Sequence, residues 1–145
     1  MSNSNYAQVS TLLAQGKLHW QTDNISALLL TGASFDAADT TVADVGGTSV
    51  GGGPVMGRAL VENKALGQPV FFSEVTADSE YQVILVQNTG PNTANVLAFI
   101  DENFDGDPIT VDRDGTLVVR PVEFDPEEAP DGTVIPPQVG VWMTL

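Results

Sequence analysis

The sequence predicts a mainly β protein, a β-sandwich or jelly roll with one short N-terminal helix. Three observations support this fold class. Most apolar residues lie in short runs rich in Val, Ile, Leu and Phe, each run is bounded by Gly, Pro, Asn or Asp, and helical spacing is found near the N-terminus. The chain has 145 residues, the usual size of one domain. We therefore expect a single domain over residues 1–145.

The predicted helix spans residues 5–15. Its apolar residues recur at the three-and-four spacing of one helix face: Tyr6, Val9, Leu12 and Leu13. Ser4 or Asn5 is expected to cap the start of the helix, since both residue types accept hydrogen bonds from free backbone N–H groups. Gly16 stands where a left-handed residue commonly ends a helix.

Eight apolar runs after the helix predict strands: Ile25–Leu30, Arg58–Glu62, Pro69–Val75, Tyr81–Gln87, Val96–Asp101, Ile109–Val111, Thr116–Arg120 and Val139–Leu145. Some runs alternate in polarity, and others are apolar throughout, as expected where both faces of a strand are covered. Eight short strands at this spacing suggest a sandwich core over residues 25–120. Residues 88–95 predict a hairpin loop between the two strongest strands, and Asp114-Gly115 predicts a tight turn.

Two segments depart from this strand pattern. Residues 46–53 hold five glycines in a long connection and predict a flexible surface loop; they lack the Lys-Ser/Thr ending of a phosphate-binding loop. Residues 121–138 are rich in proline and acid, and predict an extended, largely unpaired arm. The apolar residues 139–145 then predict a terminal strand, which either returns to its own sheet or reaches onto a neighbouring molecule.

Charge and composition exclude several classes of partner and site. Nineteen acidic residues against five basic ones give a net charge of −14, which repels nucleic acid and anionic lipid. The five basic residues form no stripe: Lys17, Arg58, Lys64, Arg113 and Arg120. No apolar run approaches the roughly 20 residues of a membrane span, and the lack of cysteine excludes disulfides and thiolate zinc sites. The acidity serves either solubility or electrostatic docking.

The sequence gives little support for catalysis. His19 is the only histidine, no second histidine or cysteine can join it in a transition-metal site, and no serine lies in a nucleophile elbow. Nineteen acids supply carboxylate pairs by chance, so such pairs do not by themselves indicate a glycosidase. We therefore predict that the protein is not an enzyme.

One acidic segment follows the calcium-loop pattern. Oxygen-bearing side chains stand at positions 1, 3, 5, 7 and 12 of this segment, namely at Asp101, Asn103, Asp105, Asp107 and Asp112, with Gly106 at position 6. Against calcium, position 12 is the shorter Asp, position 8 is Pro108, and the flanks are predicted strands. An acidic turn explains the same residues. Calcium is thus the one cofactor that the sequence leaves open.

Several segments follow one another in a characteristic order: Gly16–Trp20, Ile25–Thr31, Phe35–Asp39, Ala43–Val45, Gly57–Leu60, Val70–Thr76, Val83–Gly90 and Leu97–Asp101. This order, over about residues 6–120, resembles a family of small structural proteins of tailed bacteriophages. The resemblance implies a virion component and no catalytic residues. The calcium-like loop and the long proline-rich segment after Arg120 depart from the family pattern, so neither gains support from it.

The resemblance and the charge together suggest a capsid decoration or cement protein on the exterior of the virion. Its expected partners are the major capsid protein or other virion proteins, and a homo-oligomer is expected by analogy. Trp142, Met143 and Leu145 are the predicted apolar anchors of that interface. One alternative is a protein of the tail, neck, baseplate or fibre with a joining or adhesive role. A carboxylate-dependent glycosidase is the least favoured alternative.

Overall fold

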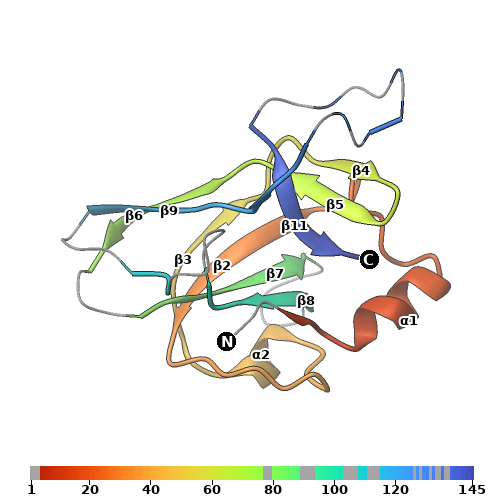
Figure 1. Cartoon of the computed structure of the whole chain (residues 1–145). Helices are drawn as coiled ribbons and strands as arrows, with labels where there is room; N and C mark the ends of the chain where they lie inside the picture. The colour runs from red at the N-terminus through yellow and green to blue at the C-terminus, as the bar shows by residue number, and fades with distance from the viewer. Residues whose placement is uncertain are drawn as a thin grey trace.

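The computed structural model describes residues 4–76, 80–88, 94–102, 108–110, 115–125, 127, 129, 130, 132, 135 and 138–145. These residues form antiparallel sheets and short helices, which confirms the mainly β prediction (Figure 1). In chain order the elements are β1 (Ser4–Asn5), α1 (Gln8–Ala14), β2 (Ile25–Thr31), α2 (Val42–Val45), β3 (Thr48–Pro54), β4 (Ala59–Val61), β5 (Lys64–Gly67), β6 (Val70–Val75), β7 (Gln82–Gln87), β8 (Asn95–Ile100), β9 (Gly115–Val119), β10 (Val122–Glu123) and β11 (Gly140–Thr144). No helix in the described part of the chain is long and apolar enough to cross a membrane.

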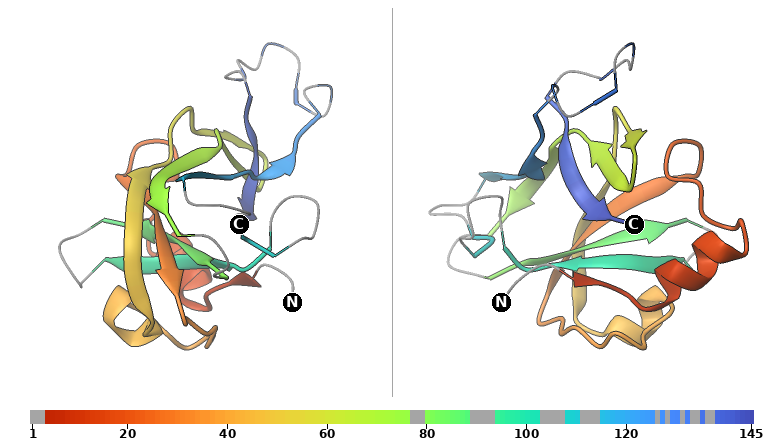
Figure 2. Two further views of the ribbon diagram at one scale, coloured as in Figure 1. Left: turned by 90° about the vertical axis from the view of Figure 1, so that its left-hand side faces the viewer. Right: turned by 45° about the vertical axis from the view of Figure 1, so that its right-hand side comes forward.

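The strands form three antiparallel sheets around a main core. The first sheet has the order β1-β8-β7-β2-β3, the second has the order β10-β11-β5-β4, and the third pairs β6 with β9. Buried side chains of β2, β7 and β8 meet those of β5, β6, β9 and β11 in one hydrophobic cluster. Figure 2 shows β5 and β11 on one side of this core and β7 and β8 on the other. The layers therefore have a sandwich-like arrangement.

Strands β7 and β8 of the first sheet are buried on both faces. On β7, Val83 and Leu85 point into the main core, whereas Ile84 and Val86 belong to a second cluster on the opposite face. That second face is covered by the segment that carries α2, which contributes Val45 to the cluster. Two covered faces explain why β7 and β8 are apolar throughout instead of alternating.

Described residues of the proline-rich segment pack against the second sheet. Phe124 is buried there in a third cluster with Ala59, Val61 and Leu66, and Ile135 packs against it. Residues Val122 and Glu123 also pair with β11 as strand β10. Within the segment predicted as an extended and largely unpaired arm, Val122–Glu123 is therefore paired. Proline-free Val122–Glu123 can supply the backbone donors that a ladder requires.

The helix is shorter than predicted because a strand takes its first residues. Ser4 and Asn5 pair with Phe99 and Ala98 of β8, so neither caps α1. The N-cap position is Ala7, which has no capping side chain. Gly16 has φ +67°, so the prediction of a left-handed residue after the helix is confirmed.

Residues 48–53 of the predicted flexible loop 46–53 belong to a strand, so the loop prediction was wrong for them. Residues Thr48–Pro54 form β3 at the edge of the first sheet. A Cβ atom at Gly51 would lie 3.3 Å from Cδ1 of Phe72, and one at Gly52 would lie 3.0 Å from Cδ2 of Leu28. The glycines thus allow neighbouring side chains to approach the backbone closely, which is a packing role rather than flexibility.

Candidate interaction site

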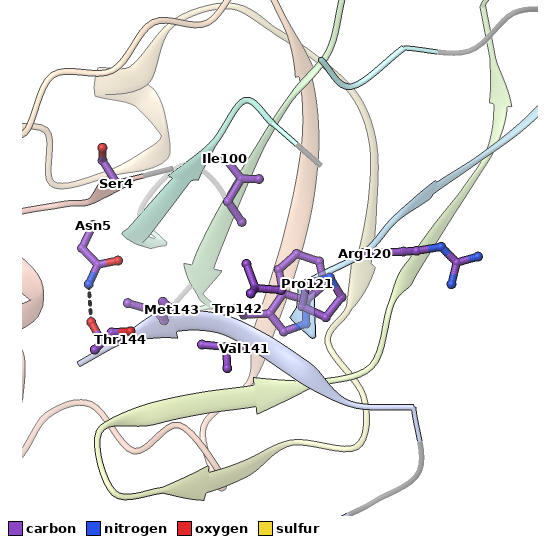
Figure 3. Close-up of a pocket in the computed structure, with 10 residues that line it drawn as sticks. Ser4, Asn5, Ile100, Arg120, Pro121, Val141, Trp142, Met143 and Thr144 are labelled. Atoms are coloured by element: carbon purple, nitrogen blue, oxygen red, sulfur yellow. Dashed lines mark hydrogen bonds between the residues drawn. The ribbon is translucent and has the colours of Figure 1, made fainter. Parts of the chain in front are cut away.

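A groove of about 500 Å³ opens between the first and second sheets (Figure 3). Its lining comes from β1, from the end of β8, and from the chain that runs through β10 and β11: Ser4, Asn5, Ile100, Arg120, Pro121, Val122, Val141, Trp142, Met143 and Thr144. Elements that are distant in sequence therefore meet here, at the place where two sheets end side by side.

The two walls of the groove are edge strands. β1 is the outermost strand of the first sheet, and β10 is the outermost strand of the second. Each has two residues and pairs with a strand on one side, β8 and β11 respectively. The first and second sheets therefore end side by side at the groove. Val122 on β10 also leaves 52% of its surface exposed.

The floor of the groove includes the residues predicted as apolar anchors. Trp142 and Met143 are 6% and 5% exposed and belong to the main core. A register shift between Val141 and Met143 interrupts the pairing of β11 with β5, and it directs two successive large side chains to the same side. The indole Nε1 of Trp142 donates to the carbonyl of Gln68 at 3.2 Å.

The anchor prediction therefore needs correction. Trp142 and Met143 are core residues of a strand that returns to its own sheet, and they cannot project into a partner from this conformation. Leu145 is partly buried against the main core, and its backbone N–H donates to the carbonyl of Asn63 at 2.7 Å. The physical reason is that a β-rich chain of this size uses its largest apolar side chains to fill its own core first.

A second hollow of about 720 Å³ adjoins the groove. It shares Val122, Val141 and Thr144 with the groove and adds Lys64, Glu123, Phe124 and Asp125. Glu123 and Asp125 are exposed. The Nζ of Lys64 lies 5.8 Å from the centre of the Phe124 ring, a cation–π distance. A hollow lined by one base and two acids thus continues the groove along β10.

Of the predicted calcium ligands, Asp101 lies within the described residues. Asn103, Asp105, Asp107 and Asp112 lie outside them. Burial raises the pKa of the Asp101 carboxyl above its usual range. Asp101 lines a hollow of about 500 Å³ together with Glu80 and Glu102. Among the described residues, no group of three His, Cys, Asp or Glu side chains is arranged to hold a metal ion.

The only histidine lies on a turn that a polar network holds in place. His19 is exposed, and its Nδ1 lies 3.9 Å from Oδ1 of Asp23. The other carboxylate oxygen of Asp23 accepts hydrogen bonds from the backbone N–H of His19 at 2.7 Å and from Nε2 of Gln87 at 2.6 Å. The Arg58 guanidinium donates to the carbonyls of Trp20 and Asp23. Asp23 therefore serves the fold of this turn.

No protein-family model, curated protein or solved structure matches this chain. The function is accordingly argued from the groove, the edge strands and the charge. Sequence reasoning missed the groove because its walls, Ser4–Asn5 and Val122–Glu123, are two-residue strands without an apolar pattern. The exposed Val122 beside the acids Glu123 and Asp125 is the one sequence signal that could have indicated it.

Proposed function

We propose that the protein is a structural component of a tailed-phage virion, a decoration or cement protein that binds the outer surface of the capsid shell. The groove between β1 and β10 carries this proposal, because two sheets end there side by side and the exposed Val122 adds an apolar surface that another subunit can cover. A protein that bridges shell subunits needs such a surface. The segment order between residues 6 and 120, which resembles small virion proteins, supports the same role.

The distribution of charge favours the exterior of the shell. The net charge is −14, and bases of this chain contact their own protein: Arg58 donates to backbone carbonyls, and Lys64 lies against Phe124. Many copies of such a surface facing the lumen would repel the phosphates of packaged DNA. On the outside, the same charge keeps neighbouring particles soluble and apart.

Counting the copies per particle tests this proposal. Quantitative mass spectrometry of purified virions, referenced to the major capsid protein, should give a ratio typical of a shell-covering protein, on the order of hundreds of copies. A count of roughly a few dozen or fewer would contradict the cement role and favour the tail or neck. Absence from the particles would overturn the virion assignment itself.

A further inference from the structure

We infer that two copies of this protein associate through strand β3, edge to edge and antiparallel, so that their first sheets join into one continuous sheet. Such a dimer goes beyond the proposed virion role and does not depend on it. Three properties of β3 support the dimer: an open edge, a lack of charge, and exposed apolar side chains toward both ends of the strand.

One edge of β3 is open. The strand ends the first sheet and pairs with β2 through residues 48–54. Within the described part of the chain, these residues form no backbone hydrogen bond beyond that pairing, and none of them is buried. Phe72 and Val70 of β6 lie over a face of the strand, against Gly51 and Gly53, and therefore do not close its edge. An edge strand of this kind directs backbone N–H and C=O groups toward solvent, where a second strand can pair with them.

The length of the open edge limits the strength of the pairing. Proline and β-bulges commonly protect edge strands from other chains. Pro54 is the last residue of β3, and the register shift opposite Leu29 and Leu30 leaves Val50 as a bulge. Between these two residues lie Gly51 to Gly53, which have no side chains to obstruct an approaching backbone. We therefore expect a dimer that dissociates in dilute solution and forms at high local concentration.

The absence of charge along β3 selects a second copy as the partner. Residues 45–57 contain no charged side chain, although the whole chain carries −14. A basic partner segment would find no acid on this strand to pair with, and repulsion between two copies is smallest where uncharged strands meet. The charges on the rest of both copies still oppose association, and salt screens that repulsion.

Two exposed apolar side chains make this edge complementary to itself. Val50 is 49% exposed near the start of β3, and Met56 is 59% exposed just beyond its end. In an antiparallel pair related by a two-fold axis, the start of one strand lies beside the end of the other. Val50 of each copy is thereby brought toward Met56 of the other, and the contact occurs twice. Burial of these side chains contributes favourably to association.

Sedimentation of the full chain tests the inference without any substitution. Up to about 1 mM protein, the chain should show a monomer–dimer equilibrium. The dimer fraction should increase as salt is raised, because the repulsion between two chains of charge −14 is screened. Backbone amides of β3 should exchange with solvent more slowly in the concentrated sample than in a dilute one. Those of β4, the edge strand of the second sheet, should exchange at an unchanged rate.

Matched double variants locate the contact. Val50→Glu with Met56→Glu places carboxylates of both copies against one another, and should raise the dissociation constant of the dimer at least about tenfold. Leu60→Glu with Phe71→Glu adds the same charge at exposed apolar positions on β4 and β6, and should change that constant less. Thermal melts show whether both variants fold, and the exchange measurement on the unsubstituted chain remains decisive if one of them does not.

A chain that stays monomeric at about 1 mM in high salt would overturn the inference. So would a dimer whose slowed amides lie outside β3, or an equal effect of the two double variants. None of these results alters the number of copies found in virions, so the dimer and the virion role can fail independently.

Discussion

The side-chain amide of Asn5 donates a hydrogen bond to the backbone carbonyl of Thr144 at 2.5 Å, across 139 residues of sequence. It joins β1, the first strand, to β11, the last, and it lies at one end of the groove (Figure 3). The first and second sheets are therefore tied together at this point by a contact between the two ends of the described chain.

Loss of this contact should have a small effect on stability. Asn5→Ala should lower the free energy of unfolding by about 0.5–1 kcal/mol, the usual net value of one hydrogen bond at an exposed site. Urea denaturation of the variant measures this change. Asn24→Ala, at another exposed asparagine, is the matched control and should leave the midpoint nearly unchanged. Equal effects of the two substitutions would show that the Asn5 contact contributes nothing specific.

The last strand should be required for folding. Trp142→Ala should lower the free energy of unfolding by about 3–5 kcal/mol, because it leaves a cavity in the main core.

Deletion of residues 138–145 removes the partner of both β5 and β10, and should leave the chain without a cooperative thermal transition. A deletion variant that melts cooperatively near the wild-type temperature would instead restore the prediction of a detachable docking segment.

The buried side chain of Gln87 should stabilise the folded protein through its hydrogen bonds. It is buried, donates to the carbonyl of Lys17 and the carboxylate of Asp23, and accepts from Asn95 at 2.9 Å. Gln87→Leu should destabilise the protein by about 2 kcal/mol, since three partly buried hydrogen bonds are lost together. Calorimetry on this variant and on Asn88→Ala, an exposed neighbour, gives the comparison. A shift no larger than that of Asn88→Ala would refute the structural role of the network.

Two strand glycines should respond differently to the same substitution. A Cβ atom at Gly67 would lie 2.6 Å from Cγ1 of Val55 and 2.8 Å from Cδ1 of Trp142, so Gly67→Ala should cost about 1–3 kcal/mol. A Cβ atom at Gly53 would lie 3.5 Å from Cγ1 of Val70, an ordinary contact. Gly53→Ala should therefore change stability by about 0.5 kcal/mol or less, or increase it. The order of the two melting temperatures checks the close packing of Trp142 on β5.

The contribution of Asp44 should depend on pH. Hydrogen bonds from the backbone N–H groups of Thr40 and Thr41 to its carboxylate hold the pKa of Asp44 below its usual value. A carboxyl with a lowered folded-state pKa stabilises the protein above its unfolded pKa, and this stabilisation is lost as the pH falls.

Asp44→Ala should consequently melt at a lower temperature than the wild type at pH 7. The gap should narrow as the pH falls below about 3.9, the usual pKa of aspartate. Thermal melts of both proteins at pH 7 and at several pH values below about 3.9 measure the gap, and Glu62→Gln on the exposed surface serves as the control. A gap that stays constant, or that widens in acid, would contradict the assignment.

For the candidate site, the sequence predicted the strand that forms the floor of the groove. It did not predict the direction in which the large side chains of that strand point. The apolar run 139–145 indicated β11 correctly, yet the register shift that directs both Trp142 and Met143 inward depends on pairing with β5. The run 64–67 carries too few apolar residues to predict that strand. With the partner strand unknown, the two large side chains could equally have been assigned to an interface.

The sequence alone determined the fold class, the short helix ending before Gly16, and most of the longer strands, because spacing and turn residues act locally. The tertiary structure decided which short segments pair. Ser4–Asn5 and the glycine-rich Thr48–Pro54 become strands because β8 and β2 offer them open edges, and Val122–Glu123 does so because β11 lies beside it. Such pairing depends on contacts between residues distant in sequence, which local patterns do not contain.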